Sequence, residues 1–258
     1  MANNVTNTNN SITSITRQAR TEPFDLQVAR GQIYGHQTLS LFGYQSSIST
    51  TSIPVWENAT TYTYPTTAST LTCSSTSVSD VAPAAFVING LDANFNPISE
   101  TVILNGTTGV TTVNSYFRVN SLVMVAVASG QTSNVGTITV KQSSNILAQI
   151  NPAIGKSQST IYTVPAGFTF YLDWVEVNTS NSYTGSTYIT YKVQTTNNKN
   201  GVTVIALQQP FVALYSANRI ADPFAYQEKT DIQWQLLSSS ATIAAGVIVI
   251  GKLISNGA

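Results

Sequence analysis

The stretch from Phe86 to Val119 constrains the fold more than any other part of the sequence, because short β-branched and aromatic runs alternate there with turn residues. Phe86–Ile88 opens one strand, and Ser99–Leu104 returns as a second strand after a turn at Asp92–Pro97. Asn105-Gly106 is a residue pair preferred in tight hairpin turns, since both residues tolerate positive φ. The stretch shows no helical pattern and predicts a strand–turn–strand meander.

The second half of the chain carries the same alternation over longer runs. We predict strands at Thr169–Asn178, Ser186–Thr195, Val202–Gln208, Val212–Ala217, Asp231–Ser238 and Gly246–Ile254. Phe168, Phe170, Leu172 and Trp174 share one parity, which predicts one buried face for the first of these strands. The Asp222-Pro223-Phe224 corner and the charges of Glu228–Asp231 are predicted to lie in a solvated loop.

These patterns predict an all-β fold of two β-sandwich domains, the second of them jelly-roll-like, preceded by an extended N-terminal arm. We assign residues 1–22 to the arm, residues 23–150 to the first sandwich and residues 151–258 to the second. The domain boundary falls in the segment Asn151–Gly155, which contains Pro152. The arm is rich in Asn, Ser and Thr, so we expect it to become ordered only along another subunit.

The surface of this protein must be nearly neutral. Charged residues make up 9% of the 258 residues, against a usual value of about 25%, and the formal net charge is zero. Such a surface does not keep copies apart by repulsion, which favours a subunit packed against neighbours; a secreted or cell-surface β-protein has the same bias. There is no basic stripe for nucleic acid and no apolar run of the roughly 18 residues that a membrane helix needs.

The sequence offers little for catalysis or metal binding. It contains one cysteine and one histidine, so no His/Cys metal cluster can be built and no cofactor site is expected. The acidic residues are scattered, and Cys73 lies in an alternating run that predicts a core position. We therefore expect no enzymatic activity. The start Met1-Ala2-Asn3-Asn4 lacks the features of a signal peptide, and we expect synthesis in a cytoplasm.

Residues near the start of the chain are the candidate partner contacts: Arg17, Arg20, Phe24, Arg30, His36, Trp56, Tyr62 and Tyr64. For Arg30 and His36 the alternative is a local salt bridge or hydrogen bond that fixes how the chain enters the domain. The three aromatic residues, together with Tyr183, could instead form a sugar-binding face, or they could close the end of a sandwich.

The order and spacing of several motifs resemble those of a family of virion structural proteins of tailed bacteriophages. The motifs are Val28–Gly35, Leu91–Val102, Leu104–Thr108, Asn114–Val119, Tyr162–Gly167, Asp231–Trp234 and Val247–Ile250. The family's role as a particle component implies a place in the virion, after assembly in the host cytoplasm, and implies no catalytic residues.

We expect from this resemblance a capsid decoration or cement protein, a homo-oligomer with a trimer favoured, bound to the major capsid protein or other virion subunits. A neck, collar, tail or fibre-attachment component is the alternative within the particle. A carbohydrate-binding β-sandwich module is the alternative from another class, and an enzyme is the weakest reading.

Overall fold

The computed structural model describes residues 22–258 except 59, 181–187, 213–214 and 240–241. The chain is nearly all β with antiparallel sheets, which confirms the predicted class. The strands are β1 (His36–Ile48), β2 (Ile53–Pro54), β3 (Thr72–Ser75), β4 (Val81–Leu91), β5 (Pro97–Asn105), β6 (Val110–Thr111), β7 (Arg118–Ala126), β8 (Ile138–Gln142), β9 (Asn145–Ile150), β10 (Ile161–Thr163), β11 (Phe168–Thr179), β12 (Ile189–Asn197), β13 (Val202–Phe211), β14 (Tyr215–Tyr226), β15 (Thr230–Ser238) and β16 (Ile243–Ser255).

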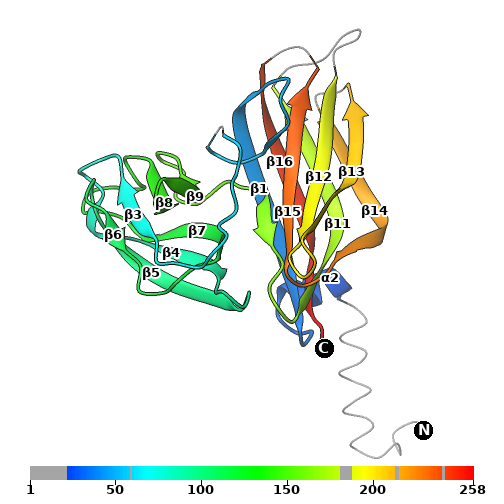
Figure 1. The fold of residues 1–258 in the computed structure, drawn as a ribbon, viewed down its shortest axis with the longest axis horizontal. Coiled ribbons are helices and arrows are strands. Elements are labelled where there is room, and N and C mark those ends of the chain that lie inside the picture. Colours follow the sequence, from blue (N-terminus) through cyan, green and yellow to red (C-terminus); the bar gives the residue numbers. More distant parts are fainter. Residues whose placement is uncertain (1–21, 59, 181–187, 213–214, 240–241) are drawn as a thin grey trace, which may run out of the picture.

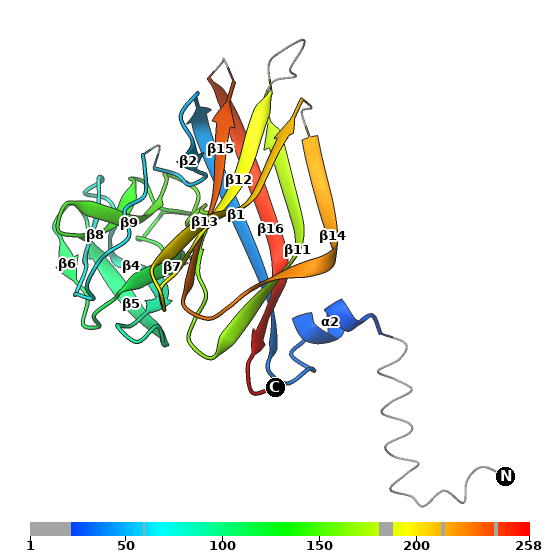
Figure 2. The ribbon, with the colours of Figure 1, turned by 45° about the vertical axis from the view of Figure 1, so that its right-hand side comes forward.

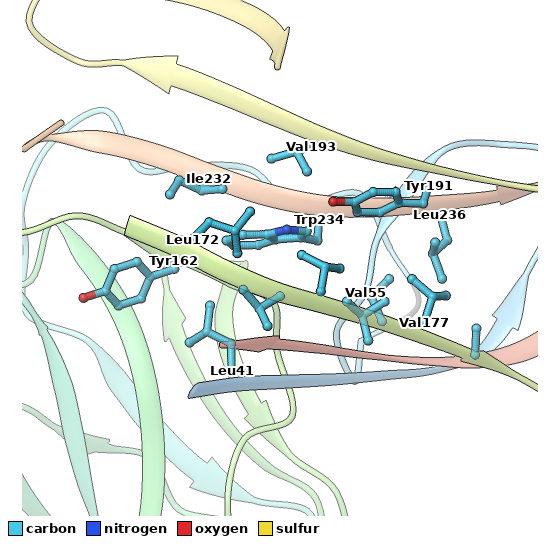
Figure 3. Close-up of a cluster of buried hydrophobic side chains, with 14 of the residues drawn as sticks. Leu41, Val55, Tyr162, Leu172, Val177, Tyr191, Val193, Ile232, Trp234 and Leu236 are labelled. Carbon is cyan, nitrogen blue, oxygen red and sulfur yellow. The ribbon is translucent and has the colours of Figure 1, made fainter. Parts of the chain in front are cut away.

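Two sheets form what we call the main unit, residues 36–55 and 160–255. One has the order β1-β16-β11-β14, and the other has the order β10-β15-β12-β13 with β2 also paired to β15. The sheets face each other (Figures 1 and 2), and their apolar side chains meet in one core. Figure 3 shows part of this core, with Leu41 and Leu172 from one sheet packed against Ile232, Trp234 and other side chains of the second.

The strands β3 to β9 form a second body, the inserted unit, residues 56–159. Its sheets have the orders β6-β3-β8-β9 and β5-β4-β7, and they enclose a separate core that includes Phe86, Leu122 and Ile138. The chain enters the inserted unit at Trp56 and leaves it at Ser159. These two segments run side by side, because Trp56 and Ser159 form a β-bridge. The inserted unit therefore interrupts the main unit between β2 and β10, and it lies beside β1 in Figure 1.

This pairing corrects the predicted domain boundaries. We had assigned residues 23–150 to one sandwich, but β1 pairs along its length with β16, and β2 pairs with β15. Residues 36–54 thus belong with the C-terminal strands. The reason is physical: β1 and β16 each bury one face in the main core, and only long-range pairing satisfies their backbone groups together.

The predicted meander is confirmed at its centre. Strands β4 and β5 form an antiparallel pair joined by the turn after Leu91. The Asp92 carboxylate accepts hydrogen bonds from the backbone N–H groups of Asn94 and Asn96, each at 2.8 Å. Local side-chain chemistry therefore sets this part of the fold. The hairpin predicted at Asn105-Gly106 is wrong, because the next strand, β6, leaves β5 after one isolated bridge and pairs with β3.

Strand β11 departs from the predicted parity. Phe170 and Leu172 are buried as expected, but the register with both neighbours shifts between Leu172 and Trp174. This bulge moves the buried face to Val175 and Val177, because one extra residue reverses the alternation. Trp174 consequently lies outside the core cluster.

Two predicted loop segments are also strand. The Asp222-Pro223-Phe224 corner lies within β14, an edge strand, where proline is tolerated because one side of the strand makes no ladder hydrogen bonds. Glu228 and Lys229 form the turn as predicted, but Asp231 lies in β15 and is buried.

A short helix, α2 (Phe24–Ala29), precedes β1. Pro23 precedes it and Asp25 lies in its first turn, a favourable place for a negative charge. Lys252 on β16 binds Asp25 at 2.9 Å and also pairs with Asp173 on β11. These ion pairs hold α2 against the β1–β16–β11 sheet.

The inserted unit is fixed to the main unit through Arg118, at the start of β7. Its guanidinium binds the carboxylate of Asp231 on β15 in a bidentate pair, with both N–O distances at 2.9 Å. The two side chains are 4% and 3% exposed. Arg118 also donates to the carbonyls of Pro65 and Phe117, and the Thr163 hydroxyl donates to Asp231 at 2.6 Å. The pair is thus nearly saturated with partners.

Aromatic rings enclose the same guanidinium. Its central carbon lies 4.0 Å from the centre of the Phe117 ring, 4.8 Å from Tyr64 and 5.6 Å from Phe95. Such contacts stabilise a desolvated cation. Close by, Asn120 on β7 exchanges two hydrogen bonds of 3.0 Å with the backbone of Thr163. These contacts define one orientation of the inserted unit.

Glu57 has a buried carboxyl group at the point where the chain enters the inserted unit. Burial raises the pKa of Glu57 from 4.5 to about 8, and the backbone N–H groups of Gln158 and Asn151 lower it only in part. Neither carboxyl oxygen has a hydrogen-bond partner of good geometry among the described residues. The neutral form of Glu57 is therefore favoured in the folded protein.

We predict that Asp231→Ala lowers the free energy of unfolding by about 3–5 kcal/mol, because it leaves the Arg118 cation buried and uncompensated. The matched control is Lys199→Ala, which breaks the exposed Lys199–Glu228 pair and should cost less than about 1 kcal/mol. Urea denaturation followed by circular dichroism measures both. Equal, small losses would contradict the anchoring role of the pair.

We predict a pH-dependent effect for Glu57→Gln. The folded-state pKa of Glu57 is raised, so the contribution of this side chain to stability is greatest below about pH 4.5, falls as the pH rises toward about 8, and then levels off. The variant should therefore gain urea resistance over the wild type at about pH 9 relative to about pH 4. A difference between the two proteins that does not change with pH would show that Glu57 is not buried as described.

Candidate functional site

The predicted contacts near the start of the chain serve local structure where the structure describes them. Arg17 and Arg20 lie outside the described residues. Arg30 pairs with Glu22, and His36 Nδ1 lies 2.9 Å from the carbonyl oxygen of Tyr34. The half-exposed ring of Phe24 meets the His36 ring edge-on, with centres 5.9 Å apart. These contacts agree with the local alternative considered for Arg30 and His36, in which they fix the path into β1.

The aromatic residues Trp56, Tyr62 and Tyr64 do not form a sugar-binding face. They pack edge-to-face in series, with ring centres 5.1 and 4.9 Å apart. Trp56 is 2% exposed and donates its Nε1–H to the carbonyl of Thr60, and Tyr64 lies against Arg118. A buried indole offers no face to a ligand, so this prediction is wrong for Trp56. Tyr183 lies outside the described residues.

Groups with catalytic or metal-binding chemistry are sparse. Within the described ranges, no cluster of three or more His, Cys, Asp or Glu side chains could hold a metal ion. Cys73 is a fully buried core residue, as predicted, and burial raises the pKa of its thiol to about 12. None of the helices in the described part of the chain is long and apolar enough to cross a membrane.

The surface feature that stands out is strand β13, which lies at the edge of its sheet. Val202, Val204 and Ile205 are 51%, 49% and 49% exposed. Only Leu207 and Phe211 of this strand pack against the main core. The outer side of β13 pairs with no other strand of the described residues. Such an edge offers apolar side chains and unpaired backbone groups together.

The register shows that this edge exposes the inner face of the sandwiched sheets. Val204 lies opposite Thr195 on β12, and directly opposite residues of antiparallel strands project to the same face. Thr195 is buried, so Val204 points to the core side of its sheet and still remains half exposed. The core layer is therefore open at this edge.

The facing strand β14 shows the same feature. Phe224 lies opposite the buried Leu172 on β11, so it points to the inner face of its own sheet. It is nevertheless 47% exposed. Strands β13 and β14 each lie at one edge of their own sheet in the main unit.

A shallow depression of about 430 Å³ lies at the other end of β13, on the outer face of the same sheet, because its lining residues Gln208 and Pro210 lie opposite Lys192 and Thr190 of β12. Its lining includes Tyr188 from the residues before β12, and Pro210, Phe211 and Val212 at the end of β13. Tyr188 and Val212 are 41% and 59% exposed. We call Tyr188, Val202, Val204, Ile205, Val212 and Phe224 together the β13 edge.

Charge is absent along this stretch of chain. No charged residue occurs between Lys199 and Arg219, whereas edge strands that stay unpaired commonly carry lysine or other charges. Pro210 and a bulge opposite Val193 and Gln194 are the protective features that β13 has. The surface thus suits close contact with another neutral protein surface.

The β13 edge was not identified from the sequence, although the run Val202–Phe211 was correctly read as strand as far as Gln208. Its apolar residues gave the signal of an ordinary half-buried strand. Comparison of the chain with protein-family models, curated proteins and solved structures found no match.

We predict that Val204→Lys weakens self-association of the protein at least tenfold, because burying the new ammonium group in an apolar contact is unfavourable. The control is Val113→Lys, the same change at a residue of the inserted unit that is 88% exposed. Sedimentation over a range of concentrations measures the dissociation constants. A wild-type protein that stays monomeric throughout, or two variants that behave alike, would contradict the prediction.

Proposed function

We propose that the protein is a non-enzymatic structural subunit of a tailed-bacteriophage particle, of the capsid decoration or cement type. The observation that carries this proposal is the β13 edge, where the core layer of the main unit opens to solvent. Leaving several half-exposed Val, Ile and Phe side chains in water costs free energy that burial against a neighbour recovers, at roughly 25 cal/mol for each Å² covered.

We further infer that the main unit is a jelly roll and the inserted unit a second sandwich. The support comes from strand order. With β2 and β10 taken as one strand, since both lie along β15, the eight strands of the main unit number 1-8-3-6 in one sheet and 2-7-4-5 in the other. This order contains two Greek keys, and such double-sheet folds are frequent in viral capsid and lectin domains.

Fold alone does not assign function, so the proposal also rests on composition and surface. The nearly uncharged chain can meet its neighbours without the cost of desolvating ions. A contact repeated at every lattice position adds strength through multivalency even when each contact is modest. The bidentate Arg118–Asp231 pair would keep both units of each subunit in one relative orientation, which such repetition requires.

A homo-oligomer, with a trimer favoured, agrees with the chemistry of the β13 edge. A closed ring of three needs a heterologous contact, in which this edge meets a different surface of the next copy. The remaining partners in the proposal are the major capsid protein and other virion subunits. The arm, residues 1–22, would lie along one of them.

We predict that an antibody against this protein labels purified phage particles over the whole head. Quantitative mass spectrometry of the same particles should give a copy number comparable with that of the major capsid protein. A single ring of copies at one vertex would instead favour the neck or collar alternative. Absence of the protein from purified particles would refute a structural role in the virion.

A further inference from the structure

A cleft separates the inserted unit from the main unit beside the buried Arg118–Asp231 anchor. Its volume is about 440 Å³, within the range of roughly 300–1,000 Å³ that small-molecule sites occupy. One wall comes from the start of β1, the end of β16 and Phe168 of β11. The other comes from β4, β5 and β7 of the inserted unit. Sites of this kind are common where two domains meet.

The lining of the cleft carries no charged side chain. Its polar members are amides and hydroxyls, among them Gln37, Asn89, Asn120 and Ser121. Two of these are already held in place: the Asn89 amide donates to the Ser121 hydroxyl at 3.2 Å, and Asn120 is clamped to the backbone of Thr163. These groups are thus pre-organised for hydrogen bonding, beside apolar walls such as Phe168 and Leu253.

Tyr162 supplies a hydroxyl group that indicates a ligand with hydrogen-bonding groups. The residue is 6% exposed, and its ring belongs to the main core. Its hydroxyl points away from the other labelled core side chains in Figure 3. It lines the cleft. Burial raises the pKa of this phenol, so it stays a neutral donor and acceptor.

We propose that this cleft binds a neutral saccharide, with the Tyr162 hydroxyl and the surrounding amides as hydrogen-bond partners of its hydroxyl groups. A sugar ring combines hydroxyls with an apolar C–H face, which matches amides and serines beside phenylalanine and leucine. An acidic sugar would bring a carboxylate into a cleft where no lining cation can pair with it. A purely apolar molecule would leave the Tyr162 hydroxyl and the Gln37 amide without partners.

This proposal is independent of the virion role, because the cleft lining and the β13 edge share no residue. It also replaces the sugar-binding face that the sequence predicted at Trp56, Tyr62 and Tyr64 with a different set of residues. A binding site for neutral glycans would add recognition to a protein whose other surface serves assembly.

The test is saturation-transfer NMR and titration calorimetry on the full chain with maltose, cellobiose, lactose and digalacturonate. At least one neutral disaccharide should bind, and digalacturonate should bind at least tenfold more weakly. Electrophoresis in gels containing a neutral polysaccharide then distinguishes two sources. Retardation of the protein in the gel indicates that the ligand is a glycan on a surface. Binding of the disaccharide without retardation indicates that the ligand is a free sugar.

Tyr162→Phe should raise the dissociation constant of the neutral disaccharide about tenfold, because it removes one hydroxyl and leaves the ring in the core. Ser121→Leu narrows the cleft from the other wall and should reduce binding further. The control is Tyr191→Phe, which removes a hydroxyl buried in the same core and outside the cleft; it should leave the affinity unchanged. Thermal unfolding of each variant establishes that it is folded.

The proposal is overturned if none of the neutral saccharides binds, or if digalacturonate binds as tightly as they do. It is also overturned if folded Tyr162→Phe and Ser121→Leu proteins keep wild-type affinity.

Discussion

The arrangement of this protein depends on one buried ion pair, Arg118 with Asp231, which joins two bodies that otherwise have separate cores. Each partner comes from a different unit, and each would be a costly isolated charge without the other. The aromatic rings around the guanidinium, two backbone carbonyls and the side-chain oxygen of Asn198 complete the enclosure. Because the bidentate geometry is directional, it fixes orientation as well as contact. The shape of the cleft beside the ion pair depends on this fixed orientation of the two units.

Parts of the fold that depend on interactions between residues close in the sequence could be predicted, and parts that depend on long-range pairing could not. The hairpin of β4 and β5 was predictable, because the Asp92 carboxylate acts on backbone groups only two and four residues away. The pairing of β1 with β16 was not, because alternation identifies a strand and leaves its partner open. The same limit hid the Arg118–Asp231 pair, whose members carry no local signal and were read as a family motif and a solvated turn.

The site predictions failed for a related reason. Trp56 has the residue type of a sugar-stacking surface, but burial is decided by tertiary packing, and here the indole fills the crossing between the two units. Conversely, the half-exposed valines of β13 look like ordinary core residues in the sequence. A single bulge in β11 was enough to reverse the inward parity after Leu172. Exposure therefore carried the functional information, and only the three-dimensional arrangement gives exposure.

The interruption of the main unit by the inserted unit has a consequence for synthesis on the ribosome. Strands β3 to β9 and their core emerge as one continuous segment and can fold as soon as it is complete. Strand β1 emerges earlier but must wait for β16, which follows the whole inserted unit in the sequence. During that interval its partly apolar inner face has no native partner, and non-local pairing of this kind is slow. We therefore expect the inserted unit to fold before the main unit. Strand β1 is then among the last strands to reach its native pairing, although it is translated before the inserted unit.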